Sequence, residues 1–178
     1  AQNRIADCTY TAVRGNGANN IQIIANSCER LGEVAIYSEF GSEGALIANN
    51  MIDFAATGIS VTNFNEGGRL AVIQGNLIRN LFRREKEPED KRGEGIGVEA
   101  DAVVSGNTIE SAATVGIQIG WGPFMRDIAV TGNVIRRSKV GITITAAPEA
   151  GTCLIANNVI SESKDGAIRT MMFGVTSG

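Results

Sequence analysis

A short motif, an asparagine followed two places later by an apolar residue, recurs along almost the whole chain. The asparagines are Asn3, Asn26, Asn50, Asn76, Asn107, Asn133 and Asn158, with steps of 23, 24, 26, 31, 26 and 25 residues between them. A self-similar period of roughly 20 to 50 residues is typical of a solenoid, in which each repeat forms one coil of a stack. The spacing therefore predicts a single solenoid domain over residues 1–178, with about seven coils of 23–26 residues.

A second pattern predicts which secondary structure the coils contain. Short alternating runs follow each asparagine, such as Gly116–Ile119 (GIQI) and Gly141–Ile144 (GITI). Alternation of this kind, rich in Ile and Val, is typical of short strands. No segment keeps a helical period, and leucine is too scarce for a leucine-rich repeat. The predicted fold is therefore all-β, a parallel β-helix whose coils bury their apolar edges by stacking.

Three rows of aliphatic side chains are predicted to fill the core. They lie two residues after each asparagine, at the first Ile of each Gly-Ile run, and three residues before each asparagine. The asparagines themselves are predicted to point inward as a structural ladder, each in a turn that tolerates a left-handed backbone, with its amide bonded to the coils above and below. The members of this ladder are Asn26, Asn50, Asn76, Asn107, Asn133 and Asn158.

The composition argues against several classes of function. The net charge is −3 and the pI is near 5.1, whereas a nucleic-acid groove needs a basic face. The chain has no histidine, so a Ser-His-Asp triad and a His-ligated zinc site are excluded within it. Cys8, Cys28 and Cys153 stand at unmatched positions of the repeat and are expected to be free thiols. We therefore expect no cofactor, no metal, no nucleic-acid partner and no membrane span.

Candidate binding residues must come from outward positions. On the Gly-Ile strands the outward row is Arg14, Tyr37, Ser60, Gly97, Gln118, Thr143 and Arg169, and the next is Asn16, Glu39, Thr62, Glu99, Gly120, Thr145 and Met171. Aromatic side chains gather in the loops that follow, and aromatic rings beside polar strands suit the binding of sugars. The predicted substrate-binding residues are Gln118, Trp121, Phe124, Phe64, Arg126 and Arg69. The alternative for residues 121–124 is a loop that folds back over the core.

Two arrangements of outward residues could support catalysis. Glu39 and Glu99 share a row two coils apart, about 9 to 10 Å at the backbone. Their carboxyls could reach the gap of roughly 6.5 to 9.5 Å that inverting glycosidases use. Alternatively, Arg14 and Tyr37 on adjacent coils could form an elimination site, in which the arginine neutralises a uronate while the phenol moves a proton. The simpler interpretation of both sets is solvated side chains on a strand.

Two further features have no place in the repeat. The charged loop insertion at residues 83–94 holds five basic and five acidic residues, and is expected to be either a solvated loop or a lid beside the outward strands. An outward row is apolar, namely Leu46, Val72, Val103, Ala129 and Leu154. An exposed apolar stripe marks a contact surface for another subunit or another part of the chain, unless the local backbone twists and buries both rows.

The repeated Gly-Asn-x-Ile followed by Gly-Ile-x-Val resembles the right-handed parallel β-helix superfamily of pectate lyases, polygalacturonases and alginate epimerases. More narrowly, it resembles an uncharacterised bacterial family of β-helix repeat proteins exported by the twin-arginine route. The resemblance runs from Asn3 to about Thr170. It implies right-handed coils, a connection with carbohydrate, and a periplasmic or extracellular location.

The same resemblance argues against inherited catalysis. The aspartate cluster and Gly-His-Gly of polygalacturonases and the Asp-Pro-His-Asp of alginate epimerases are missing from the chain. Non-catalytic polysaccharide binding on the outward strands is therefore the favoured function. The alternatives are a lyase, epimerase or inverting hydrolase acting on uronic-acid polysaccharide, and a structural or assembly segment. Because the chain begins at Ala1 inside a coil, it is expected to be a fragment of a longer solenoid, with any export signal outside it.

Overall fold

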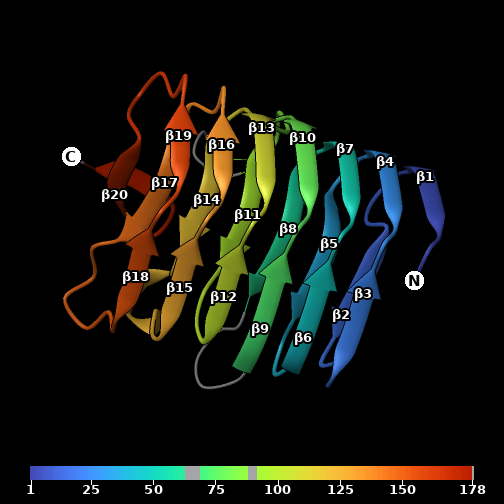
Figure 1. Cartoon of the computed structure of the whole chain (residues 1–178), viewed down its shortest axis with the longest axis horizontal. Coiled ribbons are helices and arrows are strands. Elements are labelled where there is room, and N and C mark those ends of the chain that lie inside the picture. Colours follow the sequence, from blue (N-terminus) through green and yellow to red (C-terminus); the bar gives the residue numbers. More distant parts are fainter. Residues whose placement is uncertain (63–68, 88–91, 178) are drawn as a thin grey trace.

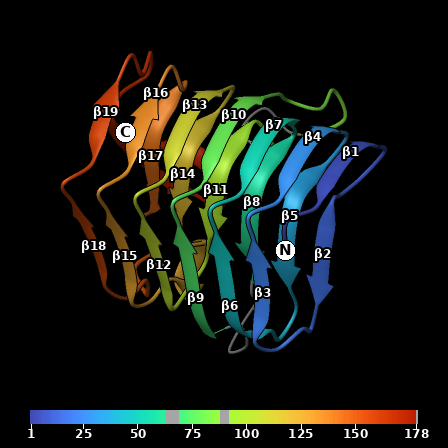
Figure 2. The ribbon, with the colours of Figure 1, turned by 45° about the vertical axis from the view of Figure 1, so that its right-hand side comes forward.

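Three β-sheets run along the length of the molecule and enclose one core (Figure 1). The structure is a computed structural model that describes residues 1–62, 69–87 and 92–177, with residue 69 described by its backbone only. The sheets have seven, eight and six strands, and successive coils lie side by side along the long axis (Figure 2). The predicted all-β parallel solenoid is confirmed, with about six complete turns where about seven coils were expected.

Each coil contributes one strand to each sheet. The first sheet contains β1 (Arg4–Cys8), β4 (Ser27–Leu31), β7 (Met51–Ala55), β10 (Leu77–Leu81), β13 (Thr108–Ala112), β16 (Val134–Arg136) and β19 (Val159–Ser161). The second contains β2 (Val13–Asn16), β5 (Val34–Glu39), β8 (Thr57–Thr62), β11 (Glu94–Val98), β14 (Val115–Ile119), β17 (Val140–Thr145), β20 (Ile168–Met172) and β21 (Val175–Ser177). The third contains β3 (Ile21–Ile24), β6 (Glu43–Ala48), β9 (Arg69–Gln74), β12 (Ala102–Ser105), β15 (Ile128–Thr131) and β18 (Cys153–Ala156).

Among the described strands, only the last pairing departs from the parallel arrangement. The strand β21 turns back and pairs antiparallel with β20. A single 3-10 turn, η1 (Gly122–Phe124), lies between β14 and β15 in the described part of the chain. No helix among the described residues is long and apolar enough to cross a bilayer.

The predicted core rows lie in register and are buried in the middle of the stack. Ile78, for example, pairs with Ile52 on one side and Ile109 on the other, and all three are fully buried. Stacked aliphatic side chains exclude water continuously from coil to coil, which is the main favourable contribution to folding. The row that begins each Gly-Ile run is less complete at its C-terminal end, where Ile168 is 51% exposed, because β21 pairs with Thr170–Met172 and leaves Ile168 uncovered.

The asparagine ladder is confirmed and lies at the corner between the third and first sheets. Asn76 illustrates it: its backbone N–H and side-chain amide donate to Oδ1 of Asn107 at 3.0 and 2.9 Å, and the amide also donates to the carbonyl of Ile47 at 3.0 Å. The expectation that the asparagine itself takes the left-handed conformation is wrong. The residue before it does so, as Gly75 (φ 63°) and Gly106 (φ 62°) show, which leaves the asparagine free to point inward.

A second left-handed position stands four residues after each ladder asparagine, and no sequence pattern indicated it. Its members are Asp7, Arg30, Phe54, Asn80, Ser111, Arg137 and Glu162. In β4, β10 and β13 this residue lies within the strand and interrupts its alternation, so the following residue also points inward, whereas Arg137 and Glu162 lie just after β16 and β19. Leu31, Leu81 and Ala112 therefore form a further buried row that strict alternation would place outside.

The buried thiol of Cys28 gives a test of this packing. All three cysteines are free, Cys28 is fully buried, and burial raises its pKa to about 11. Since only the thiolate is nucleophilic, at pH 8 about one Cys28 in a thousand is reactive even before access is considered. We expect the half-buried Cys8 and Cys153 to react with Ellman's reagent in the folded protein, and Cys28 only after unfolding. Equal rates for all three thiols would contradict this packing.

Candidate functional site

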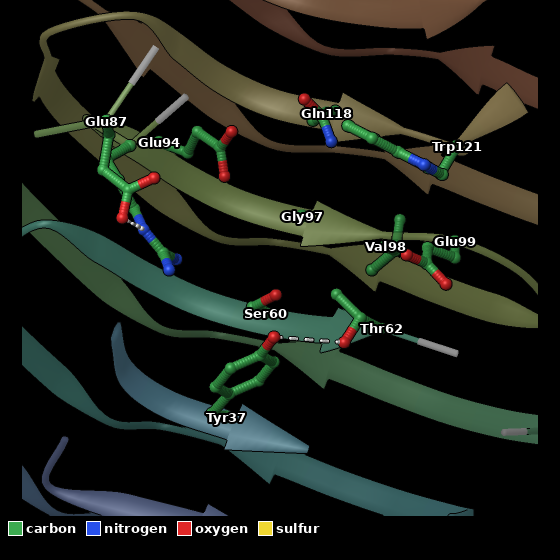
Figure 3. A pocket seen from close by; sticks show the side chains of 11 residues that line it. Tyr37, Ser60, Thr62, Glu87, Glu94, Gly97, Val98, Glu99, Gln118 and Trp121 are labelled. Carbon is green, nitrogen blue, oxygen red and sulfur yellow. Dashed lines mark hydrogen bonds and ion pairs between the residues drawn. The ribbon is translucent and has the colours of Figure 1, made fainter. Parts of the chain in front are cut away.

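The outward face of the second sheet carries a hollow of about 180 Å³, here called the strand-face pocket (Figure 3). It spans the neighbouring strands β5, β8, β11 and β14. Its lining consists of Tyr37, Ser60, Thr62, Glu87, Arg92, Glu94, Gly97, Val98, Glu99, Gln118 and Trp121. The pocket thus combines two aromatic side chains with hydroxyl, amide and carboxylate groups.

The predicted outward row forms the base of the pocket. Tyr37, Ser60, Gly97 and Gln118 pair in sequence across four strands. Gly97 leaves the base open at its centre, because a Cβ atom added there would meet nothing nearer than Oε2 of Glu94 at 3.8 Å and Oγ of Ser60 at 4.0 Å. The backbone of Gly97 has no left-handed φ, so neither strain nor crowding requires glycine at this position.

The charged insertion forms one wall of the pocket. Arg84 lies 3.1 Å from the carboxylate of Glu33, at the start of β5, and Arg92 lies 3.9 Å from the same carboxylate. Arg92 also pairs with Glu87 at 3.7 Å, which holds the two described ends of the insertion together. Residues 88–91 lie outside the described structure. The described ends of the insertion lie beside the outward strands, and its role as a solvated loop or a lid remains a prediction.

Trp121 stands at the far side of the pocket. Its ring meets that of Phe173 edge-on, with centroids 6.0 Å apart and an angle of 73°. Glycine at position 174 is needed for this contact, because a Cβ there would lie 2.9 Å from Cζ3 of the tryptophan. Met125, which directly follows the segment 121–124, is 4% exposed and packs in the core. One short loop therefore does both: Met125 packs inside and Trp121 lines the pocket.

Tyr37 is fixed in place from two directions. The hydroxyl of Thr62 donates a hydrogen bond to the Tyr37 oxygen at 3.5 Å, and the guanidinium carbon of Arg14 lies 5.2 Å from the ring centroid. Burial raises the pKa of the Tyr37 phenol, partly offset by the hydrogen bond from Thr62. The hydrogen bond to Glu39 raises the pKa of Arg14 further above its ordinary value. The phenol is therefore protonated at neutral pH and suited to donating a hydrogen bond.

The structure does not assemble either predicted catalytic arrangement within the pocket. Glu99 lines the pocket, but Glu39 does not. Glu39 is 2% exposed and its carboxylate accepts a hydrogen bond from Arg14 on the preceding coil, away from Glu99 two coils further on. Arg14 and Tyr37 do lie together, yet the charge of Arg14 is already paired with Glu39. Catalysis by these four residues remains a prediction.

The predicted binding residues divide between the pocket and other places. Gln118 and Trp121 line it, whereas Phe124 is half-buried in η1. Arg126 pairs with Asp101 at 2.6 Å, where it joins the turns before β15 and β12. Phe64 and the side chain of Arg69 lie outside the described residues. The sequence analysis did not identify Glu87 and Arg92 as lining residues. The one signal that could have found them is the position of the insertion, which immediately precedes β11.

Within the described ranges, no three acidic or thiol side chains come close enough together to hold an ion.

The fold and the pocket together define a class, a parallel β-solenoid with a ligand-sized hollow on its outward strands. The family model described as right-handed β-helix region matches residues 1–135, and the chain belongs to this family. Comparisons with curated proteins and with solved structures gave no match. Right-handed coils, expected from the resemblance, are therefore confirmed, whereas the narrower twin-arginine family and the exported location remain predictions.

Proposed function

We propose that this chain binds a polysaccharide in the strand-face pocket without cleaving it. The observation that carries the proposal is the placement of Tyr37 and Trp121 on opposite sides of one hollow. Sugar sites commonly combine aromatic faces with a few converging polar groups, and Ser60, Thr62 and Gln118 supply such groups here. From β5 to β14 the pocket crosses three strand spacings, about 14 Å, which suits a short stretch of glycan rather than a single small molecule.

Binding without cleavage fits the carboxylates better than hydrolysis does. An inverting hydrolase needs an acid and a base that flank one glycosidic bond. Here Glu99 faces the pocket, whereas Glu39 is engaged by Arg14. An extracytoplasmic location, where polysaccharides are met, belongs to the same proposal.

Gly97→Val tests the proposal directly. The branched side chain would project into the base of the pocket, where a Cβ meets no backbone atom within 4 Å, so we expect a folded protein that loses most of its glycan binding. The measurement is a glycan-array screen of the wild type, followed by titration of the best glycan into wild type and variant. The matched control is Ala129→Val, which adds bulk at an outward position of the third sheet, far from the pocket. Trp121→Ala should also weaken binding.

Two results would refute this function. Binding that survives both Gly97→Val and Trp121→Ala would place any glycan elsewhere. An array without any bound glycan, obtained with a protein whose circular dichroism shows intact β-structure, would remove the carbohydrate proposal altogether.

Assembly is the second candidate, because the apolar stripe does lie outside the core. Leu46, Val72 and Ala129 are half-buried, Val103 is 41% exposed and Leu154 is 55% exposed. We propose a second copy of the chain as the partner. Leu154→Lys should then reduce the sedimentation coefficient of a self-associating wild type, whereas Val159→Lys, at a similarly exposed site on the first sheet, should not. A wild type that stays monomeric up to the highest soluble concentration would contradict assembly.

A further inference from the structure

We infer that the strand-face pocket receives the end of a polysaccharide chain rather than an internal stretch of it. This inference rests on the proposed function and deepens it, because it names the part of the glycan that the same site takes. It is carried by the shape of the outward face, which is hollow on one side of Gln118 and closed on the other.

The outward row continues past the pocket, but the space above it does not. The next member of the row after Gln118 is Thr143, which pairs with it on the neighbouring strand β17. The pocket on the near side of Gln118 holds about 180 Å³. On the far side, Gln118 and Thr143 line a crevice of only about 10 Å³. Such a volume holds roughly one water molecule, so a sugar ring cannot follow the row beyond Gln118.

The hairpin of β20 and β21 closes this far side. Gly174 and Thr176 of the hairpin line the crevice together with Gln118 and Thr143, so the hairpin lies over the outward side of the sheet. Thr143 is 5% exposed beneath it, although its position in the row is outward. Its hydroxyl finds no hydrogen-bond partner among the described residues, which is an unfavourable state for a buried polar group.

Capping of the core does not explain where the hairpin lies. Ile168, the last member of its core row, stays 51% exposed, whereas the polar side chain of Thr143 is covered. Burial of apolar surface is the main gain of folding, so a segment placed only for stability would cover Ile168 before Thr143. The position of the hairpin is better explained by the shape that it gives to the outward face.

The hairpin is also fixed to the aromatic wall of the pocket. Its turn consists of Phe173 and Gly174, which both have a left-handed backbone. The ring of Phe173 packs against that of Trp121 and approaches Gly122 so closely that a Cβ there would lie 2.5 Å from Cε1 of the phenylalanine. Trp121 is therefore backed by the hairpin and forms a fixed end to the pocket.

The opposite side of the pocket leads to exposed residues. Tyr37 pairs with Arg14 on β2, and both Arg14 and Asn16 of this strand are exposed. Figure 3 shows Tyr37 at one side of the pocket and Gln118 with Trp121 at the other. A glycan chain can therefore enter over β2 and cross β5, β8 and β11, and its last sugar stops against Gln118 and Trp121.

The test counts how many protein molecules bind one glycan chain, by isothermal titration. The probes are linear hexamers and dodecamers of galacturonate, glucose and N-acetylglucosamine, free at both ends, and the same two lengths of any further sugar that the glycan array identifies. The pocket spans about 14 Å, so a dodecamer bound along its length has room for at least two proteins, whereas it offers only one end that fits the site. We expect one protein per chain at both lengths, with affinities per chain that agree within about 2-fold.

Phe173→Ala tests whether the hairpin is the closing wall. Loss of the ring releases the hairpin turn from the loop 121–124, so more than one molecule of this variant should bind a dodecamer, even if each binds more weakly. Val175→Ala is the matched control, because Val175 is 59% exposed on the same hairpin and its loss should leave one protein per chain.

The outcomes separate this inference from the proposed function. Two or more wild-type molecules on one dodecamer would overturn the inference and leave polysaccharide binding intact. A count of one for Phe173→Ala as well would show that the hairpin does not close the site, and would also overturn it. If this variant loses its fold or its binding, the wild-type count decides. Failure of every probe together with an empty glycan array would overturn the proposed function too.

Discussion

Asn107→Ala is expected to lower the free energy of unfolding by about 3 to 5 kcal/mol. The side chain accepts from the backbone N–H and the amide of Asn76 at 3.0 and 2.9 Å, and donates to Ile73 O and to Oδ1 of Asn133 at 3.0 Å each. All three asparagines are at most 1% exposed, so water cannot replace these bonds. The loss therefore includes the cost of leaving the N–H of Asn76 buried without a partner.

Urea unfolding followed by the fluorescence of Trp121, the single tryptophan, measures this change, since Trp121 lies on the coil that Asn107 begins. Thr108→Ala is the matched control, because Thr108 is the exposed residue that directly follows Asn107 and should change stability by less than about 0.5 kcal/mol. A loss below about 1 kcal/mol for Asn107→Ala would show that the ladder contributes little. Glycan binding by the folded fraction should be unaffected.

The second large effect is a contrast between two glycines on one strand. A Cβ at Gly95 would lie 2.3 Å from the carbonyl oxygen of Gly116 and 2.7 Å from Cγ2 of Ile109. Neither atom can move without shifting the next coil or a core side chain, so Gly95→Ala should destabilise the protein by about 2 to 3 kcal/mol. At Gly97 the same methyl group would meet its nearest atoms only at van der Waals distance, 3.8 and 4.0 Å. Gly97→Ala should therefore be neutral or stabilise the protein by up to about 1 kcal/mol, because glycine weakens a strand.

The two variants differ by the same methyl group at positions two residues apart, so each is the control for the other. In one urea series the unfolding midpoint of Gly95→Ala should fall, whereas that of Gly97→Ala should stay the same or rise. If both lose stability equally, Gly97 is needed for the fold, and the open base of the pocket would no longer require a functional explanation. If Gly97→Ala stays stable and weakens glycan binding, the glycine is retained for the pocket.

Most of the core could be predicted because a solenoid fixes its own register. Residues one repeat apart lie opposite each other on neighbouring strands, so the row that joins Ile52, Ile78 and Ile109 follows from counting. The same counting placed Tyr37, Gln118 and their partners in one outward row, and left the apolar stripe at Leu154 outside the core.

The repeat could not indicate backbone conformation. The left-handed residues at Arg30, Asn80 and Ser111 share no residue type, because the stacked coils impose the conformation and the side chain does not select it. As a result, the burial of Leu31 and Leu81 could not be predicted, because strict alternation along the strand places both side chains outside the core.

By itself, the sequence determined the all-β coil, the asparagine corner and the aliphatic rows, since all three repeat with the period of the chain. Only the tertiary structure decided which residues make the pocket. Arg84 pairs with Glu33, 51 residues earlier in the chain. Glu39 accepts a hydrogen bond from Arg14, and the ring of Trp121 packs against that of Phe173. The residue types that make these contacts do not recur from coil to coil, so the contacts depend on how individual side chains and loops pack against the finished stack.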